Sequence, residues 1–307
     1  MADKLLDSRS DTTVNKYFSY FMKWKTFITS KGGSALPASP VCIALYLTDL
    51  MNKGCSNHVI SSTVYGIKWA HSLNNLQDPT ENHFVKNLVE SAKRTLSRHV
   101  NKKQPVTKDL LIELCSKYES TTDVLILRDL CMILLGFSAF LRFDEIRNLH
   151  CNDITFHDDY FSLHIRKSKT DQYRHGSDVV VAKGDTIACP YSMLRRYFVE
   201  ANIFSANSHF LFKPCFRTRG ISKLIYKDKP LSYTRARETL LHRLREIAGN
   251  VDFGLHSLRS GGATDAANAS VSDRCWKRHG RWKCDKSKDG YVADSLERRL
   301  VTKQLGL

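Results

Sequence analysis

The sequence predicts a mainly α-helical protein with one small antiparallel β-sheet, built as an N-terminal helical bundle followed by an α+β domain. Apolar residues recur at helical spacing over most of the 307 residues, and only between Asp153 and Lys183 do they alternate along short runs. A polar, basic stretch that ends at Pro105 separates the two regions. The length allows two domains, each with a core of its own.

The first hundred residues form the predicted bundle. Apolar side chains from Val14 to Ile28 recur on one face of a helix, and Gly32 and Gly33 follow where that helix would end. Proline and glycine turns separate the later segments. Helices are predicted over residues 11–30, 41–50, 56–73 and 81–98.

Residues 97–105 predict an interdomain linker, because the run is polar, basic and ends in proline. An ordinary loop between two helices is the alternative. We therefore assign residues 1–100 to a helical domain, 101–106 to a basic linker and 107–307 to a second domain.

The second domain opens with two predicted helices. One runs from Lys108 to Tyr118 behind a threonine cap, and a strongly apolar one follows residues 121–123 and reaches about Phe140. Between Asp153 and Lys183, three alternating runs predict one antiparallel meander. Helical spacing returns beyond Pro190. Ser232 and Gly249 are placed to begin and end a further helix.

The charge balance favours a polyanionic partner. Lysine and arginine number 47 against 31 acidic residues, which gives a net charge of +16 and an isoelectric point near 9.5. Nucleic acid is the commonest polyanion that such a surface binds. A merely basic surface is the alternative, and charge alone separates neither DNA from RNA nor binding from catalysis.

Other features of the sequence point to an intracellular protein. No stretch of about eighteen apolar residues is free of charge, and the N-terminus lacks the apolar core of a signal peptide. The nine cysteines include no Cys-x-x-Cys pair, which favours reduced thiols. We expect the nucleus in a eukaryote and the cytoplasm otherwise.

His256 and Arg259 are the first candidate site residues. Three positions apart at the start of a predicted helix, they share one face. Backbone N–H groups at a helix N-terminus also favour an anion, so the pair suits a phosphate. Taken alone, the pattern favours an exposed polar turn.

Arg142 stands at the end of the most apolar helix, where a buried charge is costly unless it has a partner. Glu145 is placed to orient it, and a purely structural ion pair is the alternative. Further along, Trp282 precedes Tyr291 by nine residues. Considered singly, these two would be a core aromatic and a half-buried tyrosine.

Together these residues resemble the active-site pattern of the tyrosine recombinase, or phage integrase, family. Arg142 with Glu145 is similar to its first arginine box, and His256 with Arg259 to its His-x-x-Arg box. The family's lysine lies in a β-hairpin turn, where Lys169 matches best and Lys167 is the alternative. Its next positions are a histidine or tryptophan and, nine residues later, the tyrosine nucleophile, which Trp282 and Tyr291 match.

The resemblance implies cutting and rejoining of DNA through a 3′-phosphotyrosyl link to Tyr291. Arg142 and Arg259 would clamp the phosphate, with hydrogen bonds from His256 and Trp282. Lys169 would protonate the leaving 5′-oxygen. The resemblance covers about residues 107–295; residues 1–100 match the family's SAM-like core-binding domain in size and position. It implies double-stranded DNA and a homotetramer on paired sites as partners, with no metal, nucleotide cofactor or membrane.

One departure concerns Ser260-Gly261-Gly262, where many relatives have a further histidine. The glycines predict a helix that begins late or sits tightly against DNA. The form His-Ser-Leu-Arg-Ser-Gly-Gly-Ala-Thr is similar to that of recombinases carried by eukaryotic mobile elements. Two functional alternatives stay open: DNA relaxation of the type IB topoisomerase kind, and a domesticated DNA-binding protein without catalysis.

Two further groups of residues invite a role. Basic residues near the linker would line a DNA channel, with a solvated surface as the alternative; they are Lys93, Arg94, Arg98, Lys102 and Lys103. Cys275, His279 and Cys284 suggest zinc, but they are one ligand short of a tetrahedral set, so we expect no metal there.

Overall fold

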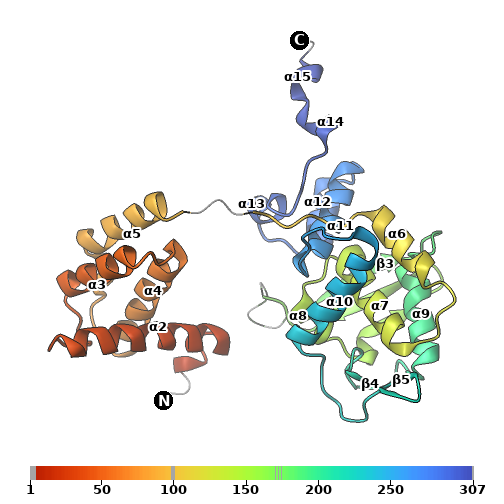
Figure 1. Cartoon of the computed structure of the whole chain (residues 1–307), viewed down its shortest axis with the longest axis horizontal. Coiled ribbons are helices and arrows are strands. Elements are labelled where there is room, and N and C mark those ends of the chain that lie inside the picture. The colour runs from red at the N-terminus through yellow and green to blue at the C-terminus, as the bar shows by residue number, and fades with distance from the viewer. Residues whose placement is uncertain (1–4, 98–100, 170, 172, 174, 306–307) are drawn as a thin grey trace. The chain divides into compact units, whose positions relative to one another are not determined.

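The computed structural model describes residues 5–97, 101–169, 171, 173 and 175–305. It divides into two compact units, Met1–Asn101 and Lys102–Leu307 (Figure 1). We describe each unit by itself.

The first unit is a bundle of helices, as predicted. Its helices are α2 (Asp11–Ser30), α3 (Pro40–Asn52), α4 (Asn57–Leu73) and α5 (His83–Thr95), with a 3₁₀ turn at Pro79–Glu81. The core between them is formed by Trp24, Ile43, Leu47, Ile60 and Ile67. The last helix begins later than predicted because Asn82, which accepts a hydrogen bond from Phe84 N, caps it.

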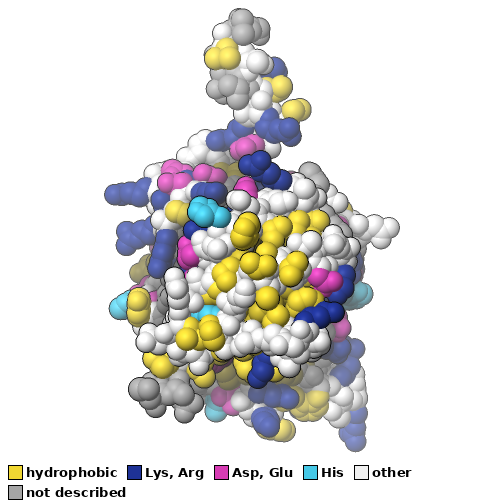
Figure 2. Space-filling model, turned by 90° about the vertical axis from the view of Figure 1, so that its left-hand side faces the viewer, with side chains coloured by type: hydrophobic (Ala, Val, Ile, Leu, Met, Phe, Trp, Pro, Cys, Tyr) yellow, Lys and Arg dark blue, Asp and Glu magenta, His cyan; other side chains and the backbone are white. Residues whose placement is uncertain are grey.

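The bundle exposes apolar side chains that its core does not use, and Figure 2 shows them gathered on one face. Among them, Val41, Leu45 and Phe84 lie along an open groove of about 590 Å³ between α3 and α5.

The second unit is built around the apolar helix α7 (Val124–Ser138), which lies near its centre in Figure 1. The remaining helices surround it or follow it: α6 (Lys108–Lys117), α8 (Phe143–Arg147), α9 (Pro190–Glu200), α10 (Tyr233–Ala248), α11 (His256–Asn268), α12 (Asp273–His279), α13 (Asp285–Asp289), α14 (Leu296–Arg299) and α15 (Val301–Gln304). The helices predicted at 108–118 and 121–140 are confirmed, and Thr107, Asp123 and Ser232 cap α6, α7 and α10.

The predicted meander is confirmed as a sheet in the order β1–β2–β3, with strands at Ile154–Phe156, Tyr160–Ile165 and Ser177–Ala182. Both pairings are antiparallel. Phe161, Leu163 and Ile165 alternate with polar residues and face the core, as a half-buried strand requires.

The prediction of only one sheet is wrong. A second, two-stranded sheet pairs β4 (Cys215–Thr218) with β5 (Ile221–Leu224). Arg219 and Gly220 form its two-residue turn, each with positive φ, as such hairpins need. Because β4 is mostly exposed, its side chains show no apolar alternation from which a strand could be inferred.

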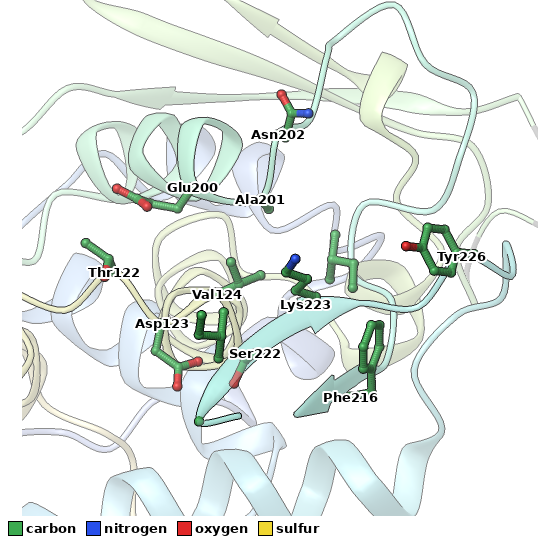
Figure 3. A pocket seen from close by; sticks show the side chains of 13 residues that line it. Thr122, Asp123, Val124, Glu200, Ala201, Asn202, Phe216, Ser222, Lys223 and Tyr226 are labelled. Carbon is green, nitrogen blue, oxygen red and sulfur yellow. The ribbon is translucent and has the colours of Figure 1, made fainter. Parts of the chain in front are cut away.

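This hairpin helps to line a pocket of about 660 Å³ (Figure 3). Asp123, at the start of α7, holds the hairpin through an ion pair with Arg217 at 2.7 Å. None of the predicted catalytic residues lines this pocket. It is therefore a feature separate from the predicted site.

The prediction for Gly261 and Gly262 also needs correction. Helix α11 begins at His256 itself and runs unbroken through both glycines. A Cβ atom on Gly261 would lie 2.1 Å from the carbonyl oxygen of Val106, and one on Gly262 would lie 2.1 Å from that of Phe137. The glycines thus let α11 pack against the protein's own backbone.

Among the described residues, no helix combines the length and the apolar character that crossing a bilayer requires.

Candidate active site

Arg142 lies at the N-cap of α8, where Glu145 holds it. The Glu145 carboxylate accepts a hydrogen bond from Arg142 N at 2.9 Å and from Arg142 Nη1 at 2.8 Å. Its other partner is Arg281, whose Nη2 lies 2.7 Å from Glu145 Oε2. One buried carboxylate therefore positions two arginines, from α8 and from the loop after α12.

The charge state of Glu145 follows from this pairing. Burial by itself would raise the pKa of its carboxyl group. The charges of Arg281 and Arg142 and the hydrogen bond from the Arg142 backbone outweigh burial, so the pKa lies below its ordinary value. Glu145 is therefore ionised at neutral pH.

We expect Glu145→Gln to lower the free energy of unfolding by about 3 kcal/mol, because it leaves two largely buried guanidinium groups without a counter-charge. Chemical denaturation followed by tryptophan fluorescence measures the change. The control is Asp144→Asn on the same helix, whose side chain is 83% exposed. Equal stability of the two variants would contradict the bridging role of Glu145.

Arg259 is the most deeply buried residue of the predicted set, with no exposed surface. From the first turn of α11, its Nη1 donates to the carbonyl of Phe140 and its Nη2 to the carbonyl of Gly280. The guanidinium lies 4.3 Å from the centre of the Trp282 ring and 5.1 Å from that of Tyr291. Burial and the nearby Arg142 lower the pKa of Arg259 to about 10, which still leaves it charged at neutral pH.

His256 is the first residue of α11, and its side chain is partly exposed. Partial burial of the imidazole and the positive charges of Arg142, Arg259 and Lys169 lower its pKa. The ring is therefore neutral at neutral pH and available as a proton acceptor. Arg142, Arg259 and Lys169 are therefore close enough to His256 for their charges to act on its ring.

Lys169 lies in the turn between β2 and β3, with its side chain exposed. Its charge is among those that lower the pKa of His256. The alternative lysine, Lys167, is likewise exposed and lies two residues earlier.

Trp282 and Tyr291 pack together near Arg259. Their ring centres lie 5.5 Å apart, and both belong to a small cluster with Phe140 and Trp276. Tyr291 lies just after α13, and its carbonyl accepts a hydrogen bond from Ser260 Oγ at 2.5 Å. Thus α11 contacts the tyrosine segment directly.

A cavity of about 410 Å³ opens beside the tyrosine. His256, Ser260 and Tyr291 line it, together with Lys102 and Lys103 at the beginning of the unit. The space is large enough to hold a phosphate group.

Three buried N–H donors, Trp282 Nε1, Arg259 Nε and Arg281 Nε, are unpaired among the described residues. Buried donors are normally paired, since an unpaired one costs about 1–3 kcal/mol. Such unpaired donors suit a site for an oxyanion.

Arg281 and Ser260 are the residues that the sequence reasoning missed. Arg281 contacts Glu145 across 136 positions of sequence, so no local spacing could reveal the pair. Its only signal is its place directly before Trp282. Ser260 directly follows Arg259 and departs from the family pattern, which therefore predicts no role for it.

The predicted DNA-contacting lysines and arginines belong to both units. Lys93 and Arg94 pair with Glu90 in the first unit, at 3.1 and 3.7 Å. In the second unit, Lys103 pairs with Asp252 at 2.5 Å and Lys102 donates to Gly290 O at 3.3 Å. Arg98 lies outside the described residues.

No group of three or more His, Cys, Asp or Glu in the described part of the chain could hold a metal ion. His279 instead donates from Nε2 to Ser138 O at 2.8 Å and packs edge-on against Phe140. Cys284 lies 3.1 Å from Ser287 Oγ. His279 and Cys284 therefore have other contacts.

Comparison with known proteins identifies similar sequences and folds. The chain is 25% identical over 293 residues to an integrase/recombinase xerD homolog of Selenomonas ruminantium, covering 94% of this chain and 83% of that protein. The fold is similar to that of the XerH site-specific recombinase bound to palindromic difH substrate, with a TM-score of 0.58, 18% identity, and coverage of 93% of this chain and 75% of that one. The fold is also similar to that of a lambda integrase tetramer bound to a Holliday junction. The TM-score is 0.55 and the sequence identity is 16%, and the match covers 95% of this chain and 75% of that one.

Residues 106–297 match the model of the phage integrase family. The match spans most of the chain and includes every residue from Arg142 to Tyr291. The chain therefore belongs to the phage integrase family, the tyrosine recombinases.

Proposed function

We propose that this chain cuts and rejoins double-stranded DNA, with Tyr291 as nucleophile and Arg142, Lys169, His256, Arg259 and Trp282 as the other catalytic residues. The observation that carries the proposal is the group of unpaired buried donors and guanidinium groups around one tyrosine. A buried guanidinium 5.1 Å from the centre of the tyrosine ring, with the indole N–H of Trp282 beside it and unpaired among the described residues, suits a phosphodiester.

In the proposed reaction the Tyr291 hydroxyl oxygen attacks the phosphorus, and the bond from phosphorus to the 5′-oxygen breaks. The products are a 3′-phosphotyrosyl link and a 5′-hydroxyl end. His256, kept neutral by its lowered pKa, would accept the tyrosine proton. Arg142 and Arg259 would neutralise the charge that grows on the non-bridging oxygens. Attack by the 5′-hydroxyl in reverse rejoins the strand, so no energy source is needed.

Lys169 would donate a proton to the departing 5′-oxygen, and a chemical rescue tests this role. We expect Lys169→Ala to slow cleavage about 10²- to 10⁴-fold. A DNA in which sulfur replaces the bridging 5′-oxygen should restore the rate, because a thiolate leaves without a proton.

Single-turnover cleavage of the oxygen and sulfur substrates measures both effects. Lys167→Ala is the matched control from the same turn and should behave like the parent chain on both substrates. Rescue of Lys167→Ala in place of Lys169→Ala would transfer the role to Lys167.

The test of the function itself is capture of a covalent adduct. A library of duplexes, randomised on both sides of a nick, is incubated with the chain, denatured, and selected for DNA that stays attached to protein. The nick lets the cleaved fragment diffuse away and so traps the adduct. Trypsin should then yield one DNA-linked peptide, residues 289–298, in which Tyr291 is the only tyrosine.

Three outcomes separate the candidate functions. Joined products from two selected duplexes are expected of a recombinase. Relaxation of supercoiled plasmid without joined products would favour a topoisomerase. Binding without any adduct would favour a protein that keeps the fold for DNA binding alone, and an adduct mapped to another peptide would contradict the role of Tyr291.

The same proposal includes the partners. The first unit would act as a SAM-like core-binding domain. Both units would contact the duplex, and the phosphate contacts would come from Lys93, Arg94, Lys102 and Lys103. A homotetramer on two paired sites would allow four strands to be exchanged in turn. A mobile element is the proposed context. In keeping with this, the fold is similar to that of a Tn1549 transposon integrase in complex with transposon right end DNA. The TM-score is 0.54 and the sequence identity is 14%, and the match covers 88% of this chain and 86% of that one.

A further inference from the structure

The helix that precedes the proposed nucleophile lacks an apolar anchor. Helix α13 reads Asp-Lys-Ser-Lys-Asp, and Lys288 is its only buried residue. A five-residue helix with no apolar face has little intrinsic stability. The position of this helix must therefore come from polar contacts.

Lys288 supplies most of these contacts. Its ammonium pairs closely with Asp273 Oδ1 and lies 3.4 Å from Asp289 Oδ1 and 3.6 Å from Asp285 Oδ1. It also lies over the ring of Trp276, 4.5 Å from the ring centre. The side chain is 5% exposed, whereas each of the three carboxylates is more than half exposed.

The contacts of Lys288 lead back to Tyr291 by two routes. Along the backbone, Tyr291 N donates to Lys288 O at 3.0 Å. Through the side chains, Trp276 packs edge-on against Trp282 at 5.5 Å, and Trp282 contacts Tyr291 at the same distance. Lys288 therefore joins α13 to α12. Tyr291 is connected to α13 through the backbone and to α12 through the tryptophan rings.

We propose that Lys288 is a positioning residue that holds the Tyr291 segment in place for attack on the phosphate. This inference rests on the nucleophile proposed above. Lys288 acts through its charge, since an apolar side chain of the same length would keep the contact with Trp276 and lose the three carboxylates. Burial opposes the charge, but the carboxylates outweigh it and raise the pKa of Lys288, so the charge persists at working pH.

The experiment compares Lys288→Met, Lys288→Arg and Asp273→Asn with Lys286→Met, a control on the exposed side of the same helix. The single-turnover rate of adduct formation is measured at saturating amounts of a duplex from the adduct selection, and its Kd is measured separately. We expect Lys288→Met to form the adduct about ten- to a hundredfold more slowly with an unchanged Kd, because small misplacements of a nucleophile have effects of this size. Lys288→Arg should recover most of the rate, and Lys286→Met should match the parent chain.

Hydrogen exchange in the absence of DNA provides a second readout, which does not depend on the reaction. We expect faster exchange over residues 285–293 in Lys288→Met and Asp273→Asn, and no change in Lys286→Met. If Lys288→Met fails to fold, Asp273→Asn and Lys288→Arg carry the test, because they keep the lysine or its charge.

The outcomes distinguish this inference from the proposed function. A parent chain that forms no adduct contradicts the proposed function, and hydrogen exchange then decides whether Lys288 fixes the segment. A parent adduct together with a normal rate in Lys288→Met overturns the inference alone. An increase in Kd that accounts for the whole loss of rate also overturns it, because Lys288 would then be a DNA contact.

Discussion

Replacing Tyr291 with phenylalanine is expected to abolish covalent attachment to DNA and leave binding and folding unchanged. The substitution removes one oxygen atom. The ring that remains still packs against Trp282 and under the Arg259 guanidinium, and the Tyr291 carbonyl keeps its hydrogen bond from Ser260. Because this oxygen forms the new bond to phosphorus, we expect cleavage to fall by at least about 10⁴-fold.

Two measurements test this expectation. Denaturing electrophoresis with a nicked duplex from the adduct selection measures the adduct, and fluorescence anisotropy measures binding of the same duplex. Tyr226→Phe is the matched control, since Tyr226 is 95% exposed and lines the separate pocket beside the β4–β5 hairpin. An adduct that persists in Tyr291→Phe at the parent rate would sink the assignment of the nucleophile.

The parts of the fold that the sequence predicted are those with a local signal. Helices α6 and α7 begin behind Thr107 and Asp123, which cap them, and β2 alternates buried and exposed residues. Caps and periodicity act over a few residues, so they can be read from the sequence directly. The β4–β5 hairpin lacks this signal because its first strand is mostly exposed. Its Arg219-Gly220 turn is the one local feature of the sequence that indicates a hairpin there.

The candidate site divides in the same way. His256 and Arg259 share a helix turn, and Trp282 and Tyr291 keep a fixed spacing, so a family pattern in the sequence could propose them together. The bridge from Glu145 to Arg281 and the cage of carboxylates around Lys288 join segments whose distance in space is set by packing. Such contacts follow from the tertiary structure and have no signature in residue spacing.

The glycines of α11 illustrate why helix propensity alone misled. A glycine pair lowers helix propensity, which predicted a late start. Tertiary packing overrides that tendency here, since any Cβ at Gly261 or Gly262 would overlap the backbone of Val106 or Phe137. The same close approach brings α11 against the end of α7, where the Phe140 carbonyl meets Arg259.

Arg259 is the residue whose loss should affect catalysis most after Tyr291. Two of its nitrogens are occupied by the carbonyls of Phe140 and Gly280, which fixes the plane of the guanidinium, while Nε has no acceptor among the described residues. A guanidinium that the protein holds in place can stabilise charge on a phosphate without reorganising during the reaction. We expect Arg259→Ala to slow adduct formation by at least about 10³-fold at saturating DNA, with binding largely retained.

Because alanine at a fully buried site also leaves a cavity, Arg259→Lys provides the second variant. Lysine keeps the charge, but its ammonium lacks the planar, forked set of donors with which the guanidinium binds the Phe140 and Gly280 carbonyls. We therefore expect Arg259→Lys to recover little of the rate. Adduct formation and Kd are measured on one duplex, with thermal unfolding to verify the fold and Arg219→Ala, in the exposed β4–β5 turn, as the control. Normal cleavage by Arg259→Ala at high protein concentration, with weakened binding alone, would make Arg259 a binding residue. Full activity of Arg259→Lys would show that charge without the forked geometry is sufficient.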